Sequence, residues 1–186
     1  MSNVLGIVGS PRKNGNTHIL VSKILEGAKQ QGATVNSISL GELSINECDG
    51  CYACWHGCEC SKHDDMNKLY PKINQADILV LGTPVYWYNT SALMKGFIDR
   101  LVYYNCEQNR GKIKEKNVVI AIPFEDQTME TVVPVVQFFE RSLKYLEMNL
   151  FDQVIVEGIS KTGEISKRKD VLDRAFLIGQ KIVKKE

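Results

Sequence analysis

Residues 4–17 read VLGIVGSPRKNGNT, and this stretch decides the fold that we expect for the chain. Its first five residues form a continuously apolar, partly β-branched run, which is typical of a strand buried on both faces of a parallel sheet. Residues 9–11 are a turn signal, and an apolar stripe at helical spacing follows over residues 21–28 until Gly32. The stretch therefore predicts a strand, a polar loop and a helix in direct succession.

The same succession repeats along the chain. Strands are predicted at 4–8, 34–40, 78–81, 118–122 and 149–157, and helices at about 21–31, 64–75, 91–104, 132–146 and 171–182. Strands that alternate with helices indicate a doubly wound α/β domain, with a five-stranded parallel sheet of order 2-1-3-4-5 and helices on both faces. We expect one domain over residues 1–186, with a cysteine-rich loop without periodicity at 44–63.

The composition excludes several classes of protein. Of 186 residues, 44% are hydrophobic and 24% charged, and 23 Lys and Arg balance 22 Asp and Glu to a net charge of +1. These values argue against a disordered chain and against binding of nucleic acid or an anionic membrane by bulk charge. No segment has the pattern of a signal peptide or the roughly 20 apolar residues of a membrane span. We therefore expect a cytoplasmic protein with neither a nucleic-acid nor a membrane partner.

The first loop, GSPRKNGNT at residues 9–17, has the chemistry of an anion site. A helix N-terminus offers unpaired N–H groups and partial positive charge, to which Ser10, Asn16 and Thr17 add neutral donors and Arg12 adds charge. The glycine spacing of dinucleotide-binding loops is absent, and so is the Lys-Ser/Thr pair of P-loops. The loop suits a terminal monoester phosphate, and the alternative is a polar turn with Asn16 as the helix cap.

A second loop, GTPVYWYNT at residues 82–90, follows the third predicted strand with a similar Gly-Thr-Pro turn. In the predicted sheet, the first and third strands flank the point where the strand order reverses, and ligands bind beyond their carboxyl ends. Three consecutive aromatic residues at that point fit a planar ring joined to a phosphate. The alternative is that these aromatic side chains serve only for packing.

The two loops, together with Lys95, Asp99 and Arg100, resemble the NADPH-dependent FMN reductases, a family of flavodoxin-like proteins. The resemblance covers about residues 3–180 and implies a flavodoxin-like FMN-binding domain. It also implies that the first loop holds the FMN phosphate and that the 83–88 loop lies against the isoalloxazine ring. The implied cofactor-binding residues are Ser10, Arg12, Asn14, Asn16, Thr17, Thr83, Pro84, Val85, Tyr86, Trp87 and Tyr88.

The resemblance implies an enzyme without a dedicated catalytic side chain, because the flavin itself carries the chemistry. Electrons would pass from NAD(P)H or a ferredoxin-like donor through FMN to a quinone, a flavin or another acceptor, in a homodimer or homotetramer. The chain departs from the family at residues 123–128, PFEDQT, where members often have a glycine-containing loop. We interpret Lys95, Asp99 and Arg100 as members of structural ion pairs.

Five of the six cysteines fall within residues 48–60, CDGCYACWHGCEC. In a reducing cytosol such a cluster indicates metal binding or redox chemistry. The spacing resembles that of the iron–sulfur flavoproteins, a branch of the same group. This resemblance implies a [4Fe–4S] cluster beside FMN, with Cys48, Cys51, Cys54 and Cys60 as its ligands. On that interpretation Cys58 is a spare, and Cys106 is a lone packing residue.

Other interpretations of the cluster stay open. Zinc could bind Cys48, Cys51, Cys60 and His63, the thiols could form a redox pair, or the loop could hold no metal. The cluster suggests an electron carrier without a small-molecule substrate as the alternative function, and a thiol- or zinc-based redox sensor as a third. His18 and His56 fit surface or capping positions better than ligand positions.

Overall fold

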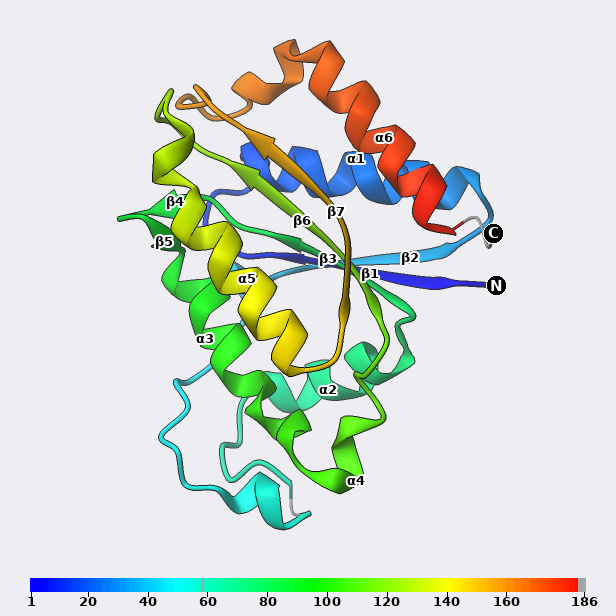
Figure 1. Cartoon of the computed structure of the whole chain (residues 1–186), viewed down its shortest axis with the longest axis vertical. Helices are drawn as coiled ribbons and strands as arrows, with labels where there is room; N and C mark the ends of the chain where they lie inside the picture. The colour runs from blue at the N-terminus through cyan, green and yellow to red at the C-terminus, as the bar shows by residue number, and fades with distance from the viewer. Residues whose placement is uncertain (58, 184–186) are drawn as a thin grey trace.

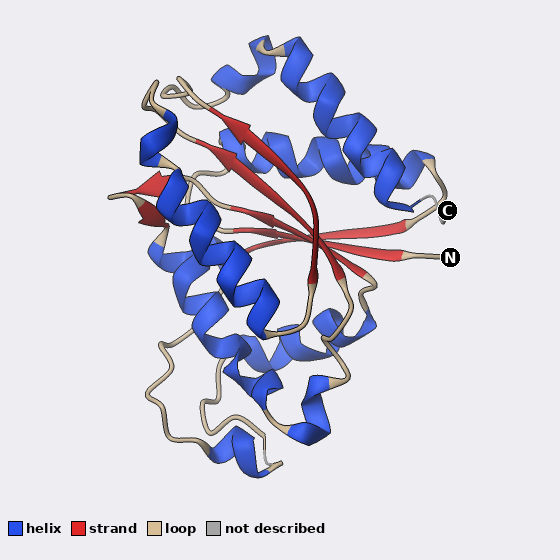
Figure 2. Ribbon diagram, viewed as in Figure 1, coloured by secondary structure: helices blue, strands red, loops and turns tan. Residues whose placement is uncertain are grey.

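A computed structural model describes residues 1–57 and 59–183 and shows a parallel sheet between two layers of helices (Figures 1 and 2). The sheet has the order β2-β1-β3-β6-β7, which is the predicted order of its five strands. Cys58, the spare cysteine, lies outside the described residues. The strands are β1 Asn3–Val8, β2 Thr34–Ser39, β3 Ile78–Gly82, β6 Asn117–Pro123 and β7 Asn149–Val156.

Each face of the sheet has its own hydrophobic core, because side chains alternate along a strand. In β6, Val119 and Ala121 pack toward one core, and Val118 and Ile120 pack toward the other. The helices divide accordingly, as Figure 2 shows. Helices α1 (Asn16–Gln30) and α6 (Lys169–Val183) cover the first face, and α2 (Met66–Gln75), α3 (Ala92–Arg100) and α5 (Val133–Tyr145) cover the second.

Two segments differ from the prediction. The helix predicted at 91–104 ends at Arg100 and continues as a 3-10 turn, Leu101–Asn105, before a short helix, α4 (Glu107–Arg110), that was not predicted. The second loop contains a small hairpin, formed by β4 (Val85–Tyr86) and β5 (Asn89–Thr90). Both elements are too short to produce a hydrophobic period.

The cysteine-rich segment is irregular, as expected, with one 3-10 turn at Ala53–His56. In Figure 1 it lies at the end of the molecule where α3 finishes, far along that helix from the β4–β5 hairpin. None of the described helices is long and apolar enough to cross a membrane.

Candidate functional site

A pocket lies where the strands end, between the two loops that the sequence singles out. Because β1 and β3 are neighbouring parallel strands, with Val8 opposite Gly82, the loops that follow them start side by side. The pocket thus forms at the point where the strand order reverses. It is lined by Ser10, Arg12, Asn16, Thr17, Pro84, Val85, Tyr86, Pro123, Phe124, Glu125, Ile159 and Ser160; we call it the rim pocket.

Ser91, which sequence reasoning missed, joins the two loops. Its hydroxyl donates a hydrogen bond to the carbonyl of Gly9 and accepts one from the Met94 N–H, 3.1 Å away, so the residue also caps α3. The Ser91 N–H donates to the Thr83 hydroxyl at 3.1 Å. The start of each loop is thereby held against the start of α3.

Thr83 supports the rim pocket from behind. Its side chain is fully buried, and its hydroxyl donates to the carbonyl of Pro84 at 2.9 Å while it accepts from Ser91. Thr83 does not line the pocket, although it was predicted among the cofactor-binding residues. Thr83 therefore shapes the second loop through its hydrogen bonds to Pro84 and Ser91.

The first loop presents buried hydroxyls and a helix terminus to the pocket. Ser10 and Thr17 are 5% and 2% exposed, and the Ser10 hydroxyl accepts from the Arg12 N–H at 3.3 Å. Gly15 is the N-cap of α1 and provides no side-chain cap, so N–H groups of the first helical turn remain for a ligand. Asn14 has a φ of 54° in this loop and does not line the pocket.

Asn16 connects the first loop to the segment that follows β7. Its amide nitrogen donates to the Lys161 carbonyl at 2.8 Å, and its amide oxygen accepts from the Ile165 N–H at 3.2 Å. The alternative interpretation of Asn16 as the helix cap is therefore wrong, since Gly15 holds that position. The side chain lines the pocket with both of its polar atoms already bonded.

The aromatic loop brings one ring, rather than three, to the pocket. Tyr86 lines it, whereas Trp87 and Tyr88 form the two-residue turn of the hairpin and are 94% and 58% exposed. Both turn residues have positive φ, 48° and 60°, as a type I′ turn requires. Bulky residues seldom adopt this conformation, so the turn is strained.

Two more loops complete the rim pocket. Pro123, Phe124 and Glu125 follow β6, in the segment where the chain departs from the resemblance. Ile159 and Ser160 follow β7. No residue of either loop was predicted among the cofactor-binding residues, although both loops leave the carboxyl ends of strands, which is the signal that could have found them.

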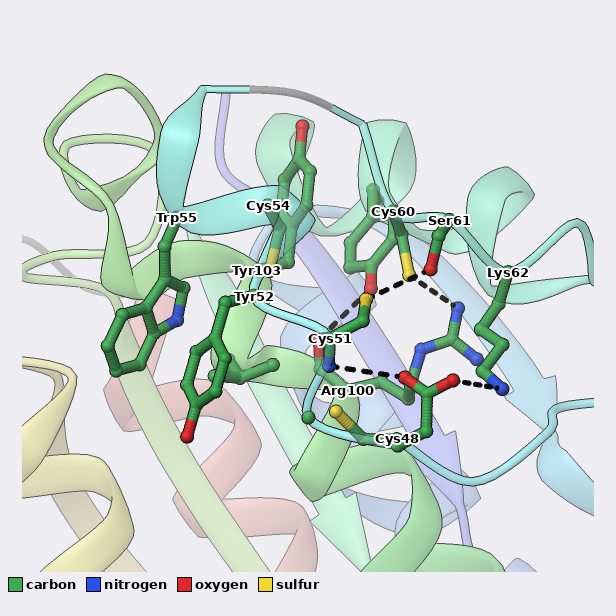
Figure 3. A pocket seen from close by; sticks show the side chains of 14 residues that line it. Cys48, Cys51, Tyr52, Cys54, Trp55, Cys60, Ser61, Lys62, Arg100 and Tyr103 are labelled. Carbon is green, nitrogen blue, oxygen red and sulfur yellow. Dashed lines mark hydrogen bonds and ion pairs between the residues drawn. The ribbon is translucent and has the colours of Figure 1, made fainter.

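A second pocket gathers the cysteines (Figure 3). It lies against the last residue of α3, where the segment 48–62 meets the 3-10 turn that follows that helix. We call it the cysteine pocket. It is lined by Cys48, Asp49, Gly50, Cys51, Tyr52, Cys54, Trp55, Cys60, Ser61, Lys62, Tyr70, Arg100, Val102 and Tyr103.

The four predicted ligands thus share one pocket. Burial raises the pKa of the Cys54 thiol, and repulsion from Cys60, Cys48 and Cys51 adds to the rise. Four soft thiols around one cavity suit a soft metal or an iron–sulfur cluster. In residues 1–57 and 59–183, however, no three His, Cys, Asp or Glu side chains are positioned to hold one metal ion. The four thiols have the chemistry of cluster ligands and line one pocket, and ligation stays a prediction.

A buried ion pair closes the inner wall of the cysteine pocket. The side chains of Arg100 and Asp64 are 1% and 2% exposed, with an Nη1–Oδ2 distance of 2.6 Å. Burial raises the pKa of Asp64, but hydrogen bonds from Arg100 and from the N–H groups of Asn46 and Met66 lower it overall. Lys95 and Asp99, also predicted to form structural ion pairs, have an Nζ–Oδ1 distance of 2.7 Å on the exposed side of α3.

The other cysteine and histidine predictions concern single residues. Cys106 is 5% exposed, and its Sγ lies 3.8 Å from the Tyr103 carbonyl, as expected of a packing residue. His63, the fourth zinc ligand of that interpretation, does not line the cysteine pocket. His18 is half-buried in α1, and His56 is exposed at the end of a 3-10 turn.

The fold and the rim pocket define the class of the protein. A doubly wound sheet of order 2-1-3-4-5, with a phosphate-type loop and an aromatic loop at its switch point, is a flavodoxin-like α/β protein. A family model described as NADPH-dependent FMN reductase matches residues 2–149. The chain belongs to this family.

Comparisons with individual proteins agree with the family. An iron-sulfur flavoprotein of Archaeoglobus fulgidus is 38% identical over 100 residues, 54% of this chain and 46% of the relative. A Bacillus subtilis protein provisionally named an NAD(P)H-dependent FMN-containing oxidoreductase is 26% identical over 174 residues, 91% of this chain and 92% of the relative. The chain spans about half the length of the iron-sulfur flavoproteins that it matches.

A solved structure shows the same fold over the whole length. The NAD(P)H:quinone oxidoreductase from Methanothermobacter marburgensis superposes with a TM-score of 0.76. The superposition covers 100% of this chain and 98% of that one, at 20% sequence identity. At this identity the likeness establishes the fold.

Proposed function

We propose that the chain is an FMN-dependent oxidoreductase that passes electrons from NAD(P)H or a ferredoxin-like donor to a quinone, a flavin or another acceptor. The observation that carries this proposal is the rim pocket, where buried hydroxyls and a helix N-terminus adjoin Tyr86. One end of the pocket suits a phosphate and the other a planar ring. The family to which the chain belongs is named for this cofactor.

The residues of the pocket divide the work of binding. Ser10, Arg12 and Thr17, with the first N–H groups of α1, would hold the phosphate, since charge-assisted and helix-terminal hydrogen bonds favour an anion. Bound FMN supplies the hydride and electron transfer. The protein's own part is to orient the ring against Pro84–Tyr86 and to offer backbone N–H groups to negative charge on it.

Flavin titration tests this proposal most simply. The flavin-free chain should take up one FMN, with a quenched or shifted flavin spectrum, and the complex should then oxidise NADH or NADPH when a quinone is supplied. Riboflavin, which has the same ring without the phosphate, should bind much more weakly. A chain that binds neither flavin would contradict the proposal, and one that binds both equally would contradict the assignment of the phosphate loop.

The cysteine pocket supports a second candidate function, that of an iron–sulfur flavoprotein which carries electrons between a [4Fe–4S] cluster and FMN without a small-molecule substrate. Four thiols line this pocket, and several relatives bear that name. Iron and labile-sulfide assays on anaerobically purified protein test for the cluster. Steady-state NAD(P)H oxidation separates the candidates, because a carrier alone would show none.

We also infer a cytoplasmic homodimer or homotetramer. Large aromatic side chains are exposed in the β4–β5 hairpin, where Trp87 is 94% exposed, and at the cysteine pocket, where Tyr52 is 54% exposed. Exposed aromatic groups are common at protein interfaces. Light scattering of the purified chain should give a multiple of 21.0 kDa. A monomer at micromolar concentration would contradict this assignment.

A further inference from the structure

Arg100 places a charged hydrogen-bond donor inside the cysteine pocket. Its Nη1 donates to the Asn46 carbonyl at 2.9 Å and to Asp64 Oδ2 at 2.6 Å. Its Nη2 donates to Asp64 Oδ1 at 3.2 Å and to Cys60 Sγ at 3.3 Å. One end of the guanidinium is thus fixed by the Asp64 carboxylate. Nη2 also reaches the Cys60 sulfur, a member of the predicted quartet, as the dashed line in Figure 3 shows.

The fifth donor of the guanidinium has no partner. Arg100 lines the pocket with a side chain that is only 1% exposed. Its Nε is buried and makes no hydrogen bond in the described structure. A buried donor without an acceptor costs about 1–3 kcal/mol. Such a donor is expected where a further negatively polarised atom completes the site.

The charges around the cysteine pocket also favour a negatively charged group beside Arg100. Asp64 offsets the charge of Arg100, but the guanidinium stands beside a pocket with four thiols, each of which gains negative charge when it ligates a metal. The Lys62–Asp49 pair at this pocket is more exposed, with side chains 27% and 51% accessible, and its field is better screened by water. Arg100 is therefore the buried cation best placed to stabilise that charge.

We propose that Arg100 is a positioning residue for a thiolate-ligated iron–sulfur cluster in the cysteine pocket. It holds the Cys60 sulfur by a charge-assisted N–H···S bond and offers Nε–H to the cluster. This inference rests on the second candidate function above. Hydrogen bonds to the sulfurs and nearby charge set the reduction potential of such clusters, so Arg100 raises that potential by stabilising the more negative, reduced form.

The test compares two substitutions that alter the ion pair from opposite sides. Wild type, Arg100→Gln and Asp64→Asn are reconstituted anaerobically with ferrous iron and sulfide, and the cluster is titrated with dithionite and followed by electron paramagnetic resonance. Arg100→Gln should lower the reduced-to-oxidised ratio at a fixed potential about tenfold, which is about 59 mV for one electron. Asp64→Asn should raise the ratio, because Arg100 then acts on the cluster without its counter-charge.

Shifts of opposite sign in Arg100→Gln and Asp64→Asn separate this role from a purely structural one. Loss of packing would lower the iron content of both variants, but it would not shift their reduction potentials in opposite directions. Lys62→Gln, which breaks the exposed pair, should change the ratio less than twofold. FMN affinity serves as the folding check in every variant. If Arg100→Gln does not fold, the double variant Arg100→Gln/Asp64→Asn, which leaves no unpaired charge, is compared with Asp64→Asn, and its reduced-to-oxidised ratio should be about tenfold lower than in that single variant.

The outcomes are distinct. Opposed shifts in Asp64→Asn and Arg100→Gln, or a ratio in the double variant about tenfold below that of Asp64→Asn, support the inference. A wild-type cluster whose potential is the same in all variants overturns the role of Arg100 and leaves the cluster intact. A wild-type chain that takes up FMN but no iron overturns the second candidate function, and this inference with it, while the FMN oxidoreductase proposal stands.

Discussion

The rim pocket and the cysteine pocket lie at the two ends of one helix and are built on different principles. Ser91 is the N-cap of α3 and holds the rim loops together, and Arg100, the last residue of α3, lines the cysteine pocket. A helix of nine residues spans about 13 Å. In Figure 1, α3 runs from the β4–β5 hairpin to the cysteine-rich segment.

The difference lies in what positions the polar groups. At the rim, parallel strands bring four loops to one edge, and the polar lining includes the small hydroxyls of Ser10, Thr17 and Ser160. In the cysteine pocket an irregular segment is held against the core by one buried ion pair, Arg100–Asp64. The rim pocket should therefore tolerate damage to the cysteine pocket, and single substitutions should separate the two.

The largest expected effect is on stability. Asp64→Ala leaves Arg100 as a buried charge without its carboxylate, which should cost about 3–5 kcal/mol of unfolding free energy. Asp49→Ala, which breaks the exposed pair with Lys62, should cost far less, because water screens an exposed ion pair. Urea unfolding measures both. Equal losses would show that the buried pair does not hold the cysteine segment.

Acid should remove part of the same stabilisation. The pKa of Asp64 is lowered in the folded chain, so the stability it adds is present above its unfolded value of about 3.9 and is lost as pH falls through the folded value. Protonation leaves the side chain in place, so this loss is smaller than that in Asp64→Ala. Unfolding free energies of wild type and Asp64→Asn, measured from pH 7 to pH 2, should differ by a constant amount above about pH 5 and approach each other below about pH 4. Parallel curves would contradict the assignment.

A substitution at the rim should weaken flavin binding without touching stability. Arg12→Ala removes a charged donor to the phosphate, worth about 1.5 kcal/mol or roughly tenfold in FMN affinity. Lys13→Ala is the matched control, because Lys13 pairs with Glu42 and does not line the pocket. Fluorescence titration with FMN should separate the two. Equal affinities would show that Arg12 does not contact the phosphate.

The smallest expected effect concerns the strained hairpin turn. Asn adopts positive φ more readily than Trp, so Trp87→Asn should raise the unfolding free energy by about 1 kcal/mol. Trp87→Ala removes the same ring but keeps a residue ill-suited to the conformation, and it should change stability less. A loss of stability in Trp87→Asn would mean that the exposed ring makes a contact that outweighs the strain.

Most of the fold was predictable because the strands are apolar and long enough to show a pattern. The buried runs at 78–81 and 118–122 each became a strand, and the sheet order followed the prediction. Pro134 lies in the first turn of α5, where a helix tolerates it. The β4–β5 hairpin was missed, since its strands have two residues each and its turn lacks the Asn-Gly signature.

The sites were predictable in part. Ser10, Thr17 and Tyr86 were found because residues at strand ends share an edge of a parallel sheet. The roles of Ser91 and Asn16 depend on partners 82 and up to 149 residues away in sequence, and no local pattern encodes them. Arg100 was interpreted as a member of a structural ion pair, but its partner Asp64 and the burial of the pair against the cysteines follow only from tertiary packing.

FMN titration of wild type beside Cys54→Ala tests most directly whether the two pockets are separate and whether the rim holds the flavin. Cys54 is buried in the cysteine pocket and absent from the rim. The structure predicts one FMN per chain with the same dissociation constant in both proteins, whatever the iron content of either. Failure of wild type to bind FMN, or an equal loss of flavin and iron in Cys54→Ala, would contradict it.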